Sequence, residues 1–195
     1  MAATESTMLE LGVQAPDFNL LNTNPNFPME SVSLADFGAA KCLLVMFVCN
    51  HCPYVIHLRD ALITLANEYE EAGLKVVAIS ANSAASHPQD GPEAMQAEAQ
   101  AHQFPYVYLY DQTQAIAKAY KAACTPDFYL FDDEQKLAYR GRFDGSRPKN
   151  DIPVTGEDMR KAVDAVLSGR MPGTEQIPSM GCNIKWAPGN EPAYF

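Results

Sequence analysis

Residues 43–53 read Leu-Leu-Val-Met-Phe-Val-Cys-Asn-His-Cys-Pro, an apolar run followed by two cysteines and a proline. The apolar run is too short to cross a membrane and shows no alternation, which predicts a strand buried on both faces. Pro53 suits the first turn of a helix, because its missing N–H would have no helical partner there. We therefore expect Cys49 and Cys52 at a helix N-terminus, directly after a core strand.

This placement predicts the chemistry of the two cysteines. The free N–H groups and the dipole of a helix N-terminus favour a thiolate over a thiol. Cys49 ends the strand, so we expect its sulfur to be partly exposed, with His51 adding positive charge beside it. Cys52, in the first turn, should lie under the loop within disulfide distance of Cys49. The sequence thus predicts Cys49 as the attacking thiolate and Cys52 as the thiol that resolves the mixed disulfide.

Length and composition indicate a soluble globular chain. It has 195 residues, of which 47% are hydrophobic and 19% charged, and this length fits one domain with a sizeable core. No stretch approaches the ~18 apolar residues of a transmembrane helix. Residues 1–7 show neither a secretory signal nor an Arg-rich transit peptide. We therefore expect a cytoplasmic protein without a membrane partner.

Charge and cysteine content narrow the function further. The net charge of −10 disfavours nucleic acid as a partner, because neutralising phosphates needs a basic face that this sequence does not show. The five cysteines are odd in number and unevenly spaced. This pattern argues against a disulfide scaffold and favours reduced thiols with one catalytic pair.

Strands and helices alternate along the chain, which predicts a single domain. Residues 1–40 predict a peripheral strand or hairpin, residues 41–168 form the core, and residues 169–195 form a tail with little periodicity. Thr155 and Asp158 have the spacing of a capping box at the start of the last helix. The expected core elements after the first strand are helix 53–72 followed by Gly73, strand 75–80, helix 92–103, strand 104–110, helix 112–123, strand 125–131, an antiparallel partner strand 136–140, and helix 155–166.

A Cys-x-x-Cys after the first core strand, and an X-Pro that opens a later strand before a hairpin, resemble the thioredoxin fold. More narrowly, four segments are similar to the thioredoxin-like branch of the redoxin family (AhpC/TSA, peroxiredoxin-related). These segments are Cys-Asn-His-Cys-Pro-Tyr-Val at 49–55, Cys-Thr-Pro-Asp-Phe at 124–128, Arg-Phe-Asp-Gly-Ser-Arg-Pro at 142–148 and Gly-Cys-Asn-Ile-Lys-Trp at 181–186.

The resemblance implies an α/β fold with a central mixed sheet flanked by helices, here with an N-terminal strand extension and a C-terminal tail. It also implies a cis peptide bond before Pro126, beside the redox pair. By the same resemblance, Thr125 and Pro126 shape the substrate groove.

The peroxiredoxin motif Pro-x-x-x-Thr-x-x-Cys is not met. With Cys52 as the peroxidatic cysteine, Cys49 occupies the threonine position and Val45 the proline position. Disulfide exchange needs only an acidified thiol and a second thiol close by. The sequence therefore predicts a thiol:disulfide oxidoreductase with no bound cofactor and no metal. Its expected partners are a disulfide-containing protein or a small thiol substrate, together with a thiol reductant.

Two other functions stay open. A thiol peroxidase would reduce hydroperoxides through Cys52 or Cys49. A metal- or partner-binding module would use the Cys-x-x-Cys loop without turnover, and a zinc site could add His51 and Cys124. The strand-to-helix context is that of redox sites, and no second ligand pair has metal spacing.

Two further thiols are candidates for the site. Cys124 lies two residues before Pro126 and could either pack in the core or serve as a third thiol. Cys182 lies in the tail, so its role depends on whether the tail folds over the redox pair.

Overall fold

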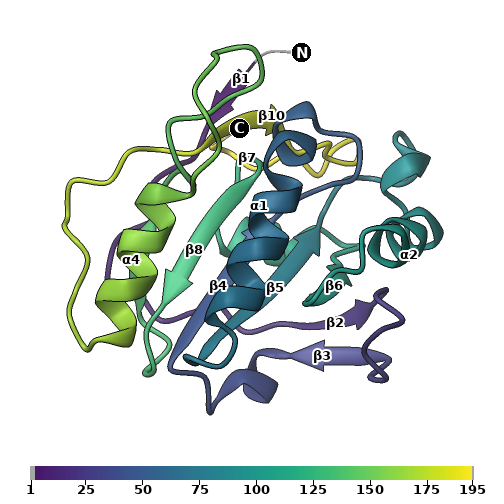
Figure 1. Ribbon diagram of the computed structural model, residues 1–195. Helices are drawn as coiled ribbons and strands as arrows, with labels where there is room; N and C mark the ends of the chain where they lie inside the picture. Colours follow the sequence, from purple (N-terminus) through teal and green to yellow (C-terminus); the bar gives the residue numbers. More distant parts are fainter. Residues whose placement is uncertain (1–2, 195) are drawn as a thin grey trace.

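A mixed sheet of seven strands organises the computed structural model, which describes residues 3–194 (Figure 1). Its strand order is β3-β2-β6-β5-β4-β8-β9, and a smaller sheet has the order β1-β10-β7. The strands are β1 (Ala3–Glu5), β2 (Asn19–Asn22), β3 (Ser31–Ser33), β4 (Cys42–Phe47), β5 (Leu74–Ser80), β6 (Val107–Tyr110), β7 (Cys124–Thr125), β8 (Asp127–Phe131), β9 (Leu137–Arg140) and β10 (Met180–Asn183). The helices are α1 (Pro53–Tyr69), α2 (Pro92–Ala101), α3 (Ala115–Ala119) and α4 (Glu157–Leu167), with short 3-10 turns η1 (Leu34–Phe37) and η2 (Pro88–Asp90).

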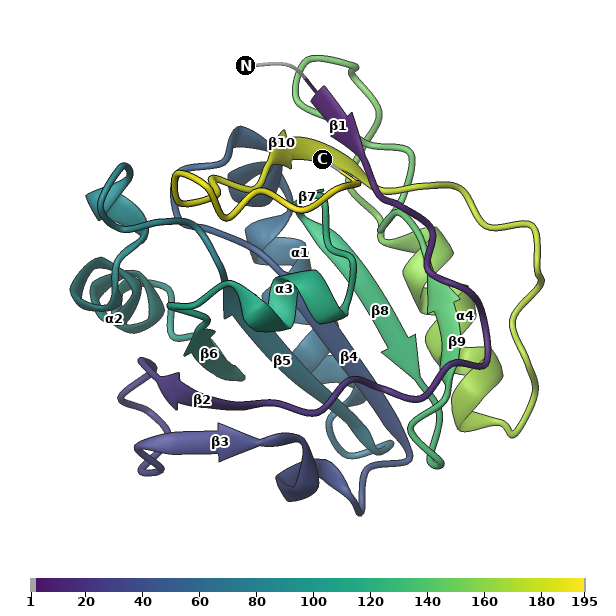
Figure 2. The same cartoon turned by 180° about the vertical axis from the view of Figure 1, so that it is seen from behind.

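β4 lies in the middle of the large sheet, and all of its residues are buried. It pairs in parallel with β5 and antiparallel with β8. Leu44 and Met46 enter the core under α1 and α4, whereas Val45 and Phe47 enter the core on the opposite face, under α3. Figures 1 and 2 show α1 and α4 on one face of the sheet and α3 on the other. Because both faces are covered, the strand needs no alternation of apolar and polar residues, as predicted.

The predicted strand, helix, strand unit is confirmed as β4, α1 and β5. α1 begins at Pro53 and buries one side against the sheet through Leu58, Leu62 and Leu65. Gly73 follows with a φ of +113°, a conformation that L side chains rarely adopt. No helix among residues 3–194 is both long and apolar enough to cross a membrane.

α3 is shorter than the predicted helix 112–123. Gln114 (φ +62°) precedes it, and Lys121 (φ +51°) follows it, both in the left-handed region. The amide side chain of Gln114 is buried and donates to the carbonyl oxygens of Ala81 (2.7 Å) and Lys185 (3.0 Å). Tertiary hydrogen bonds therefore fix the backbone where local sequence favoured more helix.

The predicted capping box at α4 is wrong, because the N-cap residue is Gly156. The backbone N–H groups of Thr155 and Gly156 instead donate to Asp144 Oδ2, at 2.7 and 2.6 Å. Asp158 turns away and pairs with Arg142 at 2.7 Å. The carboxylate of Asp144, which lies outside the helix, thus takes the place of the predicted capping side chain.

The C-terminal tail contributes strand β10, which the sequence pattern did not predict. β10 lies between β1 and β7 and places Cys182 opposite Thr125 and Asn183 opposite Cys124. Gly181 is required there, since a Cβ at this position would overlap the Thr125 carbonyl group. The tail therefore packs against the segment that carries Pro126, as Figure 2 shows for β10 and β7.

Candidate active site

The two cysteines of the Cys-x-x-Cys segment lie between the end of β4 and the start of α1. Cys52 is the N-cap residue of α1, so it precedes the first turn in which we expected it. The side chains of Cys49 and Cys52 are 1% and 0% exposed, so the predicted partial exposure of Cys49 is wrong. The connecting loop turns inward because Asp90 binds it from one side and Thr125 contacts both sulfurs from the other.

Thr125 joins the two sulfurs. Its hydroxyl oxygen Oγ1 lies 3.6 Å from Cys49 Sγ, and its carbonyl oxygen accepts a hydrogen bond from Cys52 Sγ at 3.0 Å. The Thr125–Pro126 peptide bond is cis. The structure therefore brings Thr125 and Pro126 to Cys49 and Cys52, although Thr125 is 73 residues from Cys52 in the sequence.

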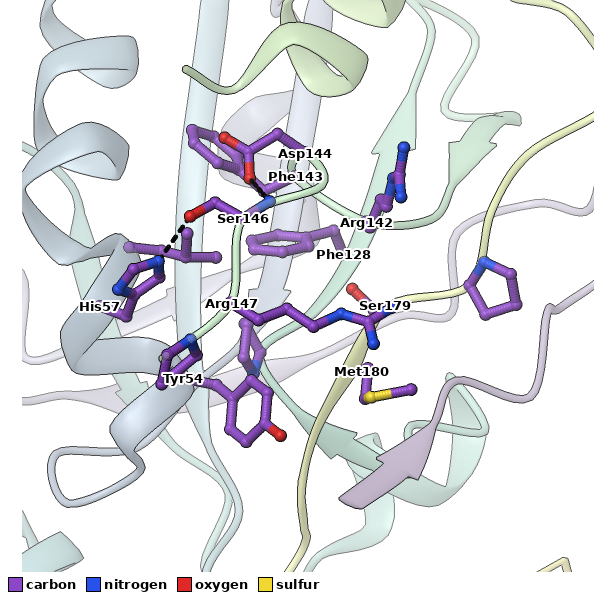
Figure 3. Close-up of a pocket in the computed structure, with 14 residues that line it drawn as sticks. Tyr54, His57, Phe128, Arg142, Phe143, Asp144, Ser146, Arg147, Ser179 and Met180 are labelled. Atoms are coloured by element: carbon purple, nitrogen blue, oxygen red, sulfur yellow. Dashed lines mark hydrogen bonds between the residues drawn. The ribbon is translucent and has the colours of Figure 1, made fainter. Parts of the chain in front are cut away.

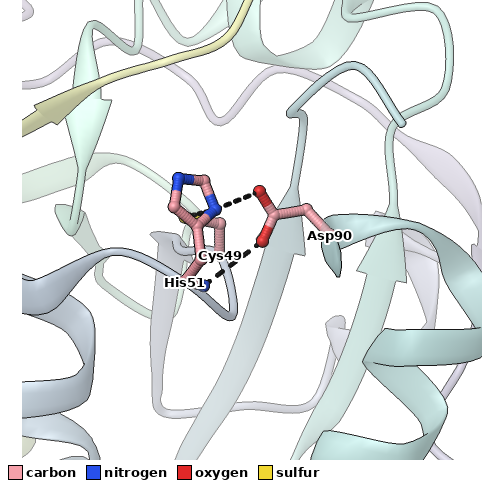
Figure 4. A group of neighbouring side chains, drawn as sticks. All are labelled: Cys49, His51 and Asp90. Carbon is pink, nitrogen blue, oxygen red and sulfur yellow. Dashed lines mark hydrogen bonds and ion pairs between the residues drawn. The ribbon is translucent and has the colours of Figure 1, made fainter. Parts of the chain in front are cut away.

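His51 points at a buried carboxylate that sequence reasoning missed. Its Nδ1 lies 2.6 Å from Asp90 Oδ2 and 3.8 Å from Cys49 Sγ (Figure 4). Asp90 is wholly buried and also accepts hydrogen bonds from the backbone N–H groups of Asn50 (2.9 Å) and His51 (3.3 Å) and from Asn82 Nδ2 (2.8 Å). No local pattern marks Asp90, which ends the 3-10 turn η2, 39 residues beyond His51.

Asp90 also changes the role expected for His51. At 2.6 Å, the Nδ1–H group donates to the carboxylate rather than to Cys49 Sγ, which is 3.8 Å away. His51 and Asp90 therefore position the loop. The negative charge of the Asp90 carboxylate disfavours ionisation of the Cys49 thiol.

The surroundings of the two thiols shift their pKa values in opposite directions. The pKa of Cys49 is raised by its hydrogen bond with Cys52, by burial and by the charge of Asp90. The pKa of Cys52 is lowered to about 5, because hydrogen bonds from Cys49, Thr125 and Cys182 outweigh its burial. The bond from Cys52 to the Thr125 carbonyl opposes this effect, since it retains the proton. On balance these surroundings favour the thiolate on Cys52 over the thiolate on Cys49.

The two additional thiols have different surroundings. Cys182 is 4% exposed and hydrogen-bonds to Cys52, and burial raises its pKa to about 12. Cys124 is fully buried and donates from Sγ to the Pro126 carbonyl oxygen at 3.5 Å. Burial and the charge of Asp127 raise the pKa of Cys124 as well. The tail thus brings Cys182 to the redox pair, whereas Cys124 is a packed, protonated thiol.

The zinc set left open as an alternative, with Cys49, Cys52, His51 and Cys124, is not assembled in the described part of the chain. The group there with ligand atoms close enough to hold a metal is Cys49, His51 and Asp90. Its 2.6 Å separation of His51 Nδ1 and Asp90 Oδ2 has the length of a hydrogen bond. Nitrogen and oxygen ligands on a tetrahedral zinc would be roughly 3.3 Å apart. These residues are therefore arranged around a proton rather than a metal ion.

Comparison with known proteins gives the family. Residues 11–140 match the AhpC/TSA family. This chain belongs to the AhpC/TSA family. Family members are redox enzymes, and solved structures of the same fold include thiol:disulfide oxidoreductases and peroxiredoxins. The predicted resemblance to thioredoxin-like redoxins and the predicted α/β fold are both confirmed.

Two solved structures are similar to this AhpC/TSA protein over nearly its whole length. An uncharacterized conserved protein from Geobacillus kaustophilus has 50% identity and a TM-score of 0.93, covering 97% of this chain and 98% of its own. A hypothetical protein from Sinorhizobium meliloti has 47% identity and a TM-score of 0.91, covering 95% and 100%. A putative thiol:disulfide interchange protein DsbE from Chlorobium tepidum, at 20% identity and a TM-score of 0.60, covers 82% and 99% and shares the fold. No curated protein matches this AhpC/TSA chain.

Proposed function

We propose that this protein is a thiol:disulfide oxidoreductase that cycles between a dithiol and a disulfide of Cys49 and Cys52. The observation that supports this most is the shared contact of both sulfurs with Thr125, one residue before Pro126. A pKa of about 5 for Cys52 makes this residue a thiolate at neutral pH, the form that attacks disulfides. Family membership supports redox chemistry of this kind.

The reaction then has two steps. The Cys52 thiolate attacks one sulfur of the substrate disulfide, forming a mixed disulfide and releasing the other half of the substrate as a thiolate. The Cys49 thiol then attacks Cys52 Sγ, the Cys49–Cys52 disulfide forms, and the second half leaves as a thiol that carries the Cys49 proton. The substrate gains two electrons, which the pair loses. An external thiol reductant restores the pair, and no bound cofactor takes part.

These roles differ from the sequence prediction, which gave the attack to Cys49. Cys49 faces the charge of Asp90, whereas Cys52 collects the hydrogen bonds that stabilise a thiolate. Both cysteines are buried, so a substrate can contact Cys52 Sγ only after a neighbouring segment of the chain has moved away from it. We infer that this segment is β10, because its residue Cys182 pairs with Thr125 beside the two sulfurs.

Reduction of hydroperoxides is the second candidate. The burial of Cys52 favours it, because a small oxidant enters a covered site more readily than a protein disulfide does. The arginine nearest in the cavity beside Cys49 is Arg59, and its guanidinium is paired with Glu98 at 2.6 Å. Its Nε, however, is buried without a hydrogen-bond partner among the described residues, so this pairing alone does not exclude a peroxide. Disulfide exchange is favoured because Cys49 stands where the peroxidatic motif has its threonine.

Kinetics of the reduced protein test the proposal. We expect it to reduce hydroxyethyl disulfide with a thiol reductant, Cys52→Ser to abolish this activity, and Cys49→Ser to accumulate a mixed disulfide on Cys52. Cys42→Ala, in β4, is the matched control and should keep the activity. Hydrogen peroxide turnover with kcat/KM above ~10⁴ M⁻¹s⁻¹, without disulfide turnover, would favour the peroxidase. Stoichiometric zinc without either activity would indicate a binding module.

A further inference from the structure

A groove bordered by Pro126 contains Arg147, which has no ionic partner among the described residues. Its walls come from the start of α1, from Pro126 and Phe128, from the loop 142–148 and from residues 178–180 of the tail. Figure 3 shows Arg147 extending from the loop across this groove toward Ser179 and Met180.

The groove adjoins the redox pair through two chain segments. Pro126, in its wall, directly follows Thr125, whose carbonyl oxygen lies 3.0 Å from Cys52 Sγ. Tyr54, in the opposite wall, is the second residue after Cys52. Neither redox cysteine lines the groove, so Pro126 and Tyr54 separate it from the pair, and a substrate bound there passes them to bring its sulfur to Cys52.

The other charged groups of the groove are already bound. Arg142 Nε pairs with Asp158 at 2.7 Å. Asp144 accepts N–H bonds from Ser146 (2.8 Å), Thr155 (2.7 Å) and Gly156 (2.6 Å), so both of its oxygens are occupied. Within residues 3–194, the guanidinium of Arg147 makes neither a hydrogen bond nor an ion pair.

The loop nevertheless holds the backbone of Arg147 in place. Its N–H donates to Asn150 Oδ1 at 2.9 Å, and Asn150 Nδ2 donates to the Gly145 carbonyl at 2.8 Å. The preceding Ser146 donates to the Ile152 carbonyl at 2.7 Å and accepts from His57 Nε2 of α1 at 2.6 Å. The loop thus holds the backbone of Arg147 while its planar guanidinium keeps its donors for a ligand, and binding then orders only the side chain.

We propose that Arg147 binds a carboxylate of the substrate, so that the preferred substrates of the proposed thiol:disulfide exchange are small anionic disulfides. The chain has a net charge of −10, and its overall field repels such molecules. A single unpaired guanidinium in the groove that Pro126 borders reverses this repulsion locally, since charge-assisted bonds to a planar carboxylate are strong and directional. The inference rests on the proposed function and specifies its substrate class.

Three small disulfides that differ in charge test the proposal. The pre-reduced protein is mixed with glutathione disulfide (anionic), hydroxyethyl disulfide (neutral) or cystamine (cationic), and the rate constant for oxidation of the pair is measured for each. Arg147→Gln is compared with Arg170→Gln, which removes the same charge from an exposed position after α4. The ratio of the anionic to the neutral rate constant reports charge recognition and is insensitive to a general loss of activity.

We expect Arg147→Gln to lower the rate constant for glutathione disulfide about tenfold, which corresponds to one charge-assisted hydrogen bond. Hydroxyethyl disulfide should be unaffected, cystamine unaffected or faster, and Arg170→Gln should behave as wild type. Equal losses for all three disulfides, or an unchanged ratio, would overturn the assignment of Arg147 while leaving the exchange function intact. Failure of the wild type with all three disulfides would instead refute the proposed function.

Discussion

Gly181 of β10 lies so close to Thr125 that only a glycine, which has no side chain, fits at this position beside the active site. A Cβ at this position would overlap the Thr125 carbonyl oxygen, which lies 3.0 Å from Cys52 Sγ. The contact couples the tail to the redox pair, because β10 also carries Cys182.

We therefore expect Gly181→Ala to displace β10 and to expose Cys52. Overpacking of this kind costs about 1–3 kcal/mol in the free energy of unfolding, measurable by urea denaturation. Alkylation of Cys52 by iodoacetamide should become faster in the same variant. Gly173→Ala is the control, since nothing lies within 4 Å of a Cβ built there. Equal stability and equal alkylation of the two variants would show that β10 does not cover the site.

The order of thiol reactivity follows from the acidities. At pH 6 the pKa of about 5 leaves Cys52 mostly as thiolate, whereas Cys49 and Cys182 have raised pKa values and remain protonated. Iodoacetamide should therefore modify Cys52 first, with a rate that rises through pH 5 and then levels off. Mass spectrometry of the alkylated peptides gives the order. Faster labelling of Cys49 would return the attacking role to that residue.

The buried carboxylate of Asp90 should hold the redox loop and keep Cys49 protonated. In Asp90→Asn, the N–H groups of Asn50 and His51 lose a charged acceptor, and a loss of about 1–3 kcal/mol in the free energy of unfolding is expected. Removing the charge should also lower the pKa of Cys49, which the pH profile of its alkylation in a Cys52→Ser background reports. The exposed Asp60→Asn is the control. An unchanged profile would mean that Asp90 acts only on the fold.

Asp127 should make the protein less stable as pH rises. Burial raises its pKa to about 7, and its Oδ1 has no hydrogen-bond partner among the described residues. The folded state keeps the proton up to about pH 7, whereas the unfolded chain releases it above about pH 4. The unfolded state therefore binds fewer protons across this window, and the free energy of unfolding falls with pH, by on the order of 4 kcal/mol from this group.

Urea denaturation between pH 4 and pH 7 checks this prediction. Asp127→Asn cannot ionise, so its stability relative to wild type should increase across the window. Asp133→Asn, in the exposed turn between β8 and β9, should run parallel to wild type. A wild-type stability that rises with pH in step with Asp127→Asn would contradict the assignment.

The sequence by itself determined the centre of the fold. The unbroken apolar run 43–48 indicated a strand covered on both faces, and Pro53 marked the start of α1, since proline fits only the first turn. The strand β5 and the hairpin of β8 and β9 were also predicted from patterns among residues close together in the chain. These features depend on residues near one another in the chain, and local propensity decides them.

Only the tertiary structure decided which thiol is acidic and what surrounds it. Cys49 and Cys52 differ little in local sequence, but Asp90 approaches the first and Thr125 and Cys182 approach the second. These partners come from a loop, a strand end and the tail, whose own sequences carry no periodic signal. A thiol pKa is set by burial, by nearby charge and by hydrogen bonds to the ionised form, and all three depend on groups that meet only when the chain is folded.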